Sequence, residues 1–357
     1  MRVYERYIGR EVIVATALVT SALLGLFGFF DMLAELRDVG RNGYQYVHAL
    51  GYVALILPGR AYELLPIGVL IGTLYALTQL ARQSEITVLR TSGLSSSQLA
   101  GTLLRVGILF ALVTLALGEF VVPATERMAQ QLKLRAMDQM VAKEFRSGLW
   151  VKDGASFVNV RDVRPDGQLL RVRIFDFDDG FRLHRVREAA TGAYAGDGEW
   201  QLGDVRQTEF VDGGAQTALI PTMSWKSGLS PDVVSVLLVD PERMALSTLI
   251  RYVSYLDENR RNAERYEIAL WQKVVYPFAS LVMILLAMPF AYLQDRFGAV
   301  SVKVFIGTML GIGFYLLNGL FSNLGAINGW PPPLAAAIPS AIFLLAAMSL
   351  LWWVERR

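Results

Sequence analysis

Cysteine is absent from the 357 residues, and histidine occurs only twice. Without cysteine the chain can form no disulfide and no thiolate metal site. His48 and His184 lie far apart and outside any HExxH motif, and the sequence contains neither a Gly-Lys dipeptide nor a GxSxG motif. The chain therefore lacks a P-loop and the common signatures of zinc and serine hydrolases. We expect it to bind no cofactor and no metal itself, and a membrane enzyme is disfavoured.

Charged residues are also scarce, at 18% of the chain against 54% for hydrophobic residues, and a net charge of +2 does not indicate a nucleic-acid partner. Soluble domains average about 25% charged residues. A membrane-spanning helix needs about 20 mostly apolar residues. Six runs meet this requirement, at residues 12–34, 61–80, 99–122, 268–293, 300–323 and 334–353. We predict an α-helical membrane protein with about six transmembrane helices, the first of them an uncleaved anchor.

Lysine and arginine near the ends of the spans predict the orientation, because they gather on the cytoplasmic side. With six spans, most of these residues fall on one side: Arg2, Arg6, Arg10, Arg82, Arg90, Arg296, Lys303, Arg356 and Arg357. Both termini are therefore expected in the cytoplasm. Arg37, Arg41 and Arg60 fall on the outer side, so the bias is incomplete.

The region between the third and fourth spans has the pattern of a β domain. Five Asp-Gly dipeptides punctuate residues 148–239, and Asp-Gly between alternating apolar and polar residues is a strong hairpin signal. In residues 169–177 the alternation slips by one position, which indicates a bulge or bend. We predict an inserted β-sandwich, similar to a jelly roll, on the outer side of the membrane.

The segment QSEITVLRTSG, residues 83–93, joins the second and third spans and keeps a helical repeat. Ile86 and Leu89 share one side of this helix, with Val88 beside them, and Gly93 provides a C-terminal stop. One interpretation is a solvated connector. The other is a docking helix, whose apolar strip enters a partner's groove while Glu85 pairs with a basic residue there.

Two further features leave alternatives open. Asp31 and Glu35 share a helix face at the outer end of the first span, either as a proton site or as headgroup-level charges near Arg37 and Arg41. Two GxxxG motifs allow close helix approach, either within the chain or at a seam between subunits. They are formed by Gly68 with Gly72 and by Gly307 with Gly311.

Several stretches resemble the LptF/LptG family of lipopolysaccharide-export ABC transporter permeases, and more closely its LptG branch. They are RYIG at 6–9, ARQSEITVLRTSG at 81–93, GEFVVP at 118–123, GLWVKDG at 148–154 and SWKSGLSPD at 224–232. The resemblance covers essentially the whole chain. It implies three segments: a first membrane half at 1–143 with a coupling helix at 82–93, a periplasmic β-jelly-roll domain at 144–240, and a linker helix with three further spans at 241–357.

The resemblance also implies a function in the inner membrane of a Gram-negative bacterium. The chain would pair with a homologous LptF-like permease, a cytoplasmic LptB-like ATPase dimer that binds ATP and Mg, and a single-span LptC-like periplasmic bridge protein. Together they would extract lipopolysaccharide from the outer leaflet. The remaining alternative is a membrane receptor with a periplasmic β sensor domain, although the cytoplasmic segments are short.

The resemblance directs attention to three groups of residues. It implies that Glu85 contacts the ATPase, and we expect Ile86, Leu89 and Arg90 to take part. Basic residues at the mouth of the transport cavity would meet lipid phosphates; the candidates are Arg37, Arg41, Lys133 and Arg135. In the β domain, Phe157 and Ile174 are the candidates for an apolar lipid groove.

Overall fold

The structure is a computed structural model that describes residues 3–40, 43–136, 148–163, 167–178, 180–196, 198–211, 214–228, 241–258, 263–291 and 300–356. Six of its helices are long and apolar enough to cross a membrane, as the sequence predicts. The first half contains α1 (Val3–Glu35), α2 (Tyr46–Arg82), α3 (Glu85–Thr91), α4 (Ser96–Ala116), the π-helix η1 (Leu117–Val121) and α5 (Val122–Ala136). The second half contains the 3-10 helix η3 (Pro241–Arg243), α7 (Leu246–Glu258), α8 (Glu264–Ala287), the 3-10 helix η4 (Met288–Ala291), α9 (Val300–Asn328) and α10 (Pro332–Glu355).

Helix α2 is the centre of the membrane domain. Its most apolar window is 83% buried within the chain, whereas those of α1 and α9 are only 22% and 17% buried. The two GxxxG motifs explain part of this close packing. A Cβ at Gly72 would lie 2.5 Å from the Cα of Thr16 on α1, and one at Gly311 would lie 2.7 Å from Ile67 on α2. Both motifs therefore serve contacts within this chain.

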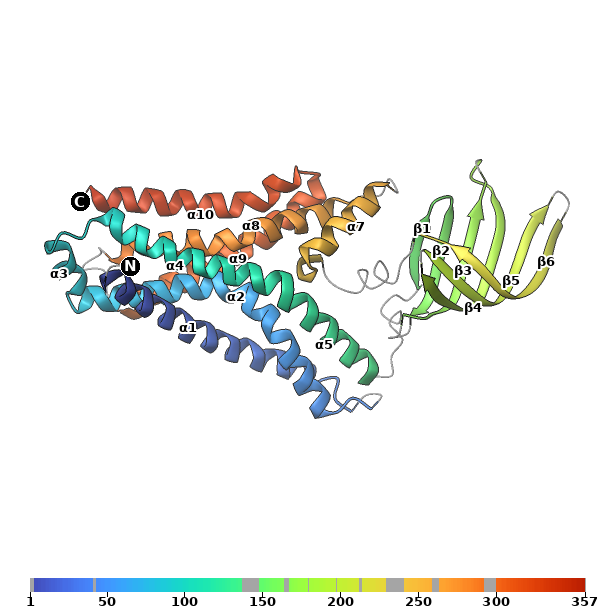
Figure 1. Ribbon diagram of the computed structural model, residues 1–357, viewed down its shortest axis with the longest axis horizontal. Helices are drawn as coiled ribbons and strands as arrows, with labels where there is room; N and C mark the ends of the chain where they lie inside the picture. The colour runs from blue at the N-terminus through green and yellow to red at the C-terminus, as the bar shows by residue number, and fades with distance from the viewer. Residues whose placement is uncertain are drawn as a thin grey trace.

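Different elements lie at the two ends of the molecule (Figure 1). The N-terminus, the C-terminus and the short helix α3 lie at one end of the helical bundle, and the β domain lies beyond the other end, past α5 and α7. This arrangement agrees with the prediction that both termini share one side and the β domain lies on the other. The predicted segment boundaries near 143 and 240 lie outside the described residues.

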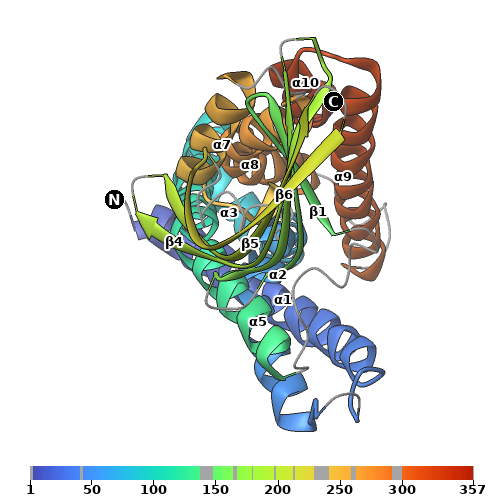
Figure 2. The same ribbon diagram turned by 90° about the vertical axis from the view of Figure 1, so that its right-hand side faces the viewer.

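The β domain is one six-stranded antiparallel sheet in sequence order. Its strands are β1 (Leu149–Asp153), β2 (Ser156–Val163), β3 (Leu169–Phe177), β4 (Leu183–Gly196), β5 (Glu199–Val211) and β6 (Gly214–Lys226). The sheet is strongly curved, as Figure 2 shows, so that one face encloses an apolar core around Trp200, Val158 and Ile174. The predicted inserted β domain is confirmed, but its described strands form one curved sheet with a buried apolar face instead of the two facing sheets of the predicted sandwich.

The bend follows a line of irregular backbone across the strands. Arg171 and Asp204 have φ values of 53° and 52°, a left-handed conformation that side chains other than glycine rarely adopt. At this line the inward positions change phase, since Leu169, Val172 and Ile174 are all fully buried. The slip predicted in residues 169–177 therefore lies at Arg171, with a second irregularity between Asp176 and Phe177.

Candidate functional site

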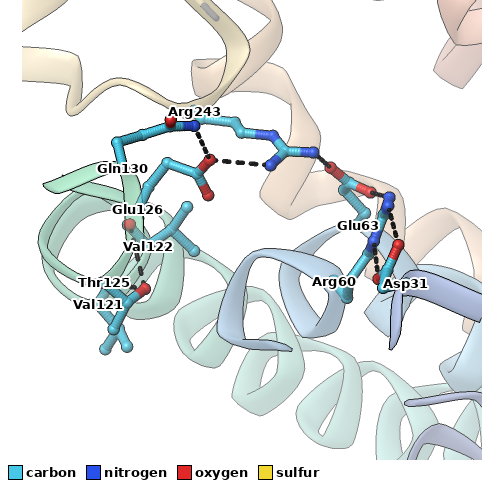
Figure 3. Close-up of polar contacts among 9 residues, drawn as sticks. All are labelled: Asp31, Arg60, Glu63, Val121, Val122, Thr125, Glu126, Gln130 and Arg243. Carbon is cyan, nitrogen blue, oxygen red and sulfur yellow. Dashed lines mark hydrogen bonds and ion pairs between the residues drawn. The ribbon is translucent and has the colours of Figure 1, made fainter. Parts of the chain in front are cut away.

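A chain of alternating charges joins both halves of the membrane domain at the end that faces the β domain (Figure 3). Arg60 on α2 donates from Nε and Nη2 to both carboxylate oxygens of Asp31 on α1, at 2.9 and 2.8 Å. Arg60 also pairs with Glu63 at 3.1 Å, and Glu63 lies 3.6 Å from Arg243. Arg243 completes the chain with an ion pair of 3.1 Å to Glu126 on α5. Charged groups on α1, α2, α5 and η3 therefore share one network.

Burial makes this network energetically important. The Glu126 side chain is only 4% exposed, and those of Arg243 and Glu63 are about one quarter exposed. Solvent screens such pairs weakly, and a buried charge that loses its partner is strongly destabilising. Since Arg243 is the last residue of η3, where the described chain resumes after the β domain, the network fastens the second half of the chain to the first.

A second set of contacts anchors the same segment. The Glu119 carboxylate accepts a hydrogen bond of 2.8 Å from the backbone N–H of Leu246, the first residue of α7. A carboxylate at a helix N-terminus satisfies an unpaired N–H and interacts favourably with the helix dipole. Glu119 lies in the π-helix η1, where Gly118 packs against Tyr62 so closely that a Cβ would lie 2.7 Å from its ring. In addition, Lys273 on α8 donates to the carbonyl oxygen of Met244.

The predicted gate residues do not form one basic cluster. Lys133 is paired with Glu35 at 2.7 Å and with Asp38 at 3.3 Å, and its Nζ lies 4.9 Å from the ring centroid of Tyr52. Arg37 and Arg135 are exposed, and Arg41 lies outside the described residues. The charge of Lys133 is thus balanced within the chain, and its assignment to lipid phosphate stays a prediction.

The paired carboxylates of the first span also have defined partners. Glu35 accepts a hydrogen bond of 2.8 Å from the Tyr44 hydroxyl. Burial and this hydrogen bond raise the pKa of Tyr44 well above its ordinary value, so the hydroxyl stays protonated and donates. Asp31 pairs with Arg60, so neither carboxylate depends on the nearby Arg37. These contacts favour a structural role for Asp31 and Glu35 over a proton site.

Sequence reasoning missed Arg243 as a site residue and gave Arg60 no role. Arg60 interrupts an apolar helix just before the predicted span 61–80, so its unusual position was a signal. Arg243 follows the Pro-Glu pair at the start of η3 and gave no such signal. Its partners Glu63 and Glu126 are more than one hundred residues away in sequence, and no periodicity links them.

An apolar pocket of about 440 Å³ lies beside this network. Its walls come from α2, α5, η3, α8 and α9, and its apolar lining includes Ile67, Phe314 and Leu316. Glu63, Arg243 and Lys273 contribute charged groups. A mostly apolar cavity with a few charged groups suits an amphipathic ligand such as a lipid.

At the opposite end of the bundle, α3 begins at Glu85, and Ser84 before it has a left-handed φ of 61°. Ile86 is 4% exposed and belongs to the core of the membrane domain, and Leu89 packs against that core. These two side chains hold α3 to its own chain, so the predicted apolar docking strip is corrected. Val88, at 61% exposed, is the apolar side chain that faces outward, and Arg90 is exposed too. Glu85 is partly exposed and lies within hydrogen-bonding reach of the Tyr7 hydroxyl.

The two candidate groove residues of the β domain lie on opposite faces of the sheet. Ile174 is directly opposite Val158 in the sheet register, and both are fully buried on the inner face. Phe157 is opposite Phe175, one position out of phase, and packs edge-to-face on Phe177 at 5.6 Å. Since directly opposite residues share a face, only Ile174 can line an inner groove, and Phe157 is corrected to the outer face.

Within the described ranges no group of three or more histidine, aspartate or glutamate residues is arranged to hold a metal ion. The described residues thus provide a pocket, an ion network beside it, a short helix at the other end of the bundle and a buried apolar face of the curved sheet. The pocket suits the binding of an amphipathic molecule.

Comparison with known proteins agrees with this conclusion. The family described as "Lipopolysaccharide export system permease LptF/LptG" matches residues 6–353. The chain is 32% identical over 354 residues to the lipopolysaccharide export system permease protein LptG of Escherichia coli K12, and the alignment covers 98% of each. It is 27% identical to LptG of Haemophilus influenzae, over 99% of this chain and 98% of the relative. The similarity to LptF of Escherichia coli K12 is lower, 23% over 98% and 94%. The chain therefore belongs to the LptF/LptG family of lipopolysaccharide export permeases.

Proposed function

We propose that this chain is a permease subunit that extracts lipopolysaccharide from the outer leaflet of the inner membrane and passes it toward a periplasmic bridge. The observation that carries this proposal is the family match, which extends over the membrane spans and the β domain alike. No feature of the described residues favours a receptor. A transport subunit needs a place for the lipid in the membrane and a continuation beyond it, and the membrane pocket and the β domain are the elements we assign to these two roles.

The apolar pocket is the proposed membrane station for part of the lipid. Its apolar lining suits acyl chains, and Lys273, whose ammonium group donates to a backbone carbonyl rather than to a carboxylate, suits the phosphate of a lipid headgroup. Acyl chains have a second apolar environment in the β domain, where Val158, Ile174 and Trp200 line the enclosed face. Arg243 of the ion network belongs to η3, which follows the β domain in sequence and borders the pocket.

Energy would come from a partner ATPase that contacts the chain at α3. Glu85, Val88 and Arg90 are at least partly exposed and would contact such a partner, whereas Ile86 and Leu89 are engaged in the chain's own core. Ile86 would then contribute by transmitting movement of α3 into the membrane domain. In this orientation α3 and both termini face the cytoplasm, and the β domain faces the periplasm.

A second, LptF-like permease would cover part of the poorly buried helices. Helices α1 and α9 expose many large apolar side chains, among them Phe29, Phe30, Phe305 and Leu316. Those faces suit either lipid tails or a homologous partner. An LptC-like bridge protein would receive the lipid from the β domain.

Purification from native membranes tests the proposal directly. A tagged chain should bring with it a second permease, an ATPase and a bridge protein, and its depletion should leave newly made lipopolysaccharide in the inner membrane. The matched control is Glu85→Lys, which should insert normally but lose the ATPase. Normal lipopolysaccharide delivery to the outer membrane after complete depletion would refute the proposal.

A further inference from the structure

A cavity on the β domain lies outside the apolar core of that domain. Its volume is about 720 Å³. A cross-strand row runs through it over all six strands, formed by Trp150, Asn159, Arg173, Glu188, Arg206 and Leu219. This row is one position out of phase with the buried row of Val158 and Ile174. The cavity therefore occupies the outer face of the sheet, which the proposed lipid path does not use.

Arginine dominates the charged lining of this outer-face cavity. Arg161, Arg171, Arg173 and Arg206 come from β2, β3 and β5 and converge on it. Arg171 pairs with Asp162, and Arg173 pairs with Glu188 at 3.0 Å. Arg161 and Arg206 have no ion-pair partner among the residues that the structure describes, and both are exposed. Two guanidinium groups in one cavity are thus available to an anion.

The backbone at the same place is strained. Arg171 and Asp204, which both line the cavity, are two of the four residues other than glycine that have a positive φ among those described. Such conformations persist only where the surrounding structure enforces them, and they concentrate at functional sites. The bend of the sheet explains the hollow shape that these residues produce. It does not explain why the hollow is lined by arginine.

The rim adds an aromatic surface. Trp150 is 50% exposed and lines the cavity, and its ring stacks on Phe175 with a centroid distance of 5.7 Å and an interplanar angle of 21°. Phe175 thus supports one side of the indole. An exposed indole supplies a rigid apolar platform with a polar edge. Guanidinium groups bind phosphate through two parallel hydrogen bonds.

We propose that the outer-face cavity binds a phosphorylated saccharide, with Arg161 and Arg206 holding the phosphates and Trp150 supporting a sugar ring. Asn159, Glu188 and Asp204 offer further polar contacts to sugar hydroxyls. The ligand chemistry has two possible sources: the sugar portion of a transported glycolipid, or a soluble phosphorylated glycan. The first deepens the proposed function and rests on it, and the second is independent of it.

The test uses the full chain in nanodiscs of zwitterionic lipid, titrated calorimetrically with deacylated lipopolysaccharide, a soluble phosphorylated oligosaccharide. Arg161→Gln with Arg206→Gln should weaken binding about tenfold or more, because two charge-assisted phosphate contacts are lost. Arg161→Lys with Arg206→Lys should retain part of the affinity. The matched control is Arg182→Gln, an exposed arginine of the same domain that does not line the cavity.

Three results would overturn the inference: unchanged affinity in the double glutamine variant, equal affinity for the dephosphorylated oligosaccharide, or equal affinity of inorganic phosphate. Trp150→Ala should weaken oligosaccharide binding and leave phosphate binding unchanged, and an unchanged oligosaccharide affinity would remove the sugar assignment. Circular dichroism of each variant confirms the fold. If intact lipopolysaccharide competes with the oligosaccharide, the ligand is the sugar portion of the lipid. If it does not compete, the ligand is a soluble phosphorylated glycan. Either result supports the site. Since binding is measured without transport, normal export after depletion of the chain, together with intact oligosaccharide binding, would refute only the proposed function.

Discussion

Replacing Arg243 by glutamine should destabilise the membrane domain by leaving Glu126 as a buried charge without its ion-pair partner. Removal of one partner from a fully buried ion pair costs about 3–5 kcal/mol. Arg243 is 26% exposed and Glu126 4%, so part of that cost is screened by solvent. We expect a loss of about 2–3 kcal/mol in the free energy of unfolding, which corresponds to roughly 30- to 140-fold in the folding equilibrium.

A second substitution, at Glu126, tests this reasoning, because its effect on stability should change sign with the residue at position 243. Glu126→Gln alone should cost less, because Arg243 keeps Glu63 at 3.6 Å. In the Arg243→Gln background, however, Glu126→Gln should be stabilising. It removes the unpaired buried charge and leaves a neutral amide near Gln130, whose Nε2 lies 3.5 Å from the carboxylate of Glu126.

Equilibrium unfolding in mixed micelles with a denaturing detergent measures all four members of this double-mutant cycle. Arg173 with Glu188 is the matched control, since their side chains are 55% and 42% exposed, and the pair should contribute at most about 1 kcal/mol. A stability of Arg243→Gln equal to that of the original chain, or a further loss in the double variant, would show that the network carries no significant interaction energy.

Three further predictions follow from named contacts. Gly72→Ala should destabilise the chain by about 1–3 kcal/mol in thermal unfolding, because the new methyl group meets the backbone of Thr16, whereas Gly25→Ala, with open space around it, should not. A photo-crosslinking residue at Val158 should capture lipopolysaccharide acyl chains in the assembled transporter, and one at Phe157 should not; equal yields would contradict the assignment of the inner face. Glu85→Lys and Val88→Asp should abolish ATPase co-purification without loss of thermal stability. Ile86→Ala should instead lower that stability by about 2–5 kcal/mol. Retention of the ATPase by Glu85→Lys would show that α3 is only a connector.

The membrane topology could be predicted from the sequence because its signal is local. A run of about 20 apolar residues is sufficient to identify a spanning helix, and Asp-Gly dipeptides mark the turns of antiparallel strands. Residues such as Gly154 and Gly198, both at positive φ, occupy those turns as expected. The short helix 85–91 was similarly visible from its repeat and from the glycine at 93.

The details of the candidate site depend on contacts that are distant in sequence. The pattern predicted an apolar strip on α3 but could not distinguish a strip for a partner from one that packs into the core of the membrane domain, to which Ile86 belongs. In the β domain, strict alternation would put Leu170 with Val172 and Ile174. The left-handed turn at Arg171 shifts the phase, so Leu169 is buried instead. A single unusual φ value thus reverses the face of every residue beyond it.

The charges at the outer end of the bundle also depend on contacts between residues that are distant in sequence. An isolated acidic residue near a span end suggests a functional group, since ionisable residues in membranes are costly. Asp31, Glu35 and Glu126 instead find cations from other helices: Arg60, Lys133 and Arg243. Arg243 of η3 pairs with Glu126 of α5, and the Leu246 N–H of α7 donates to Glu119 of η1. The described helices that precede and follow the β domain in sequence are therefore fastened to each other, and a displacement of α5 acts directly on η3.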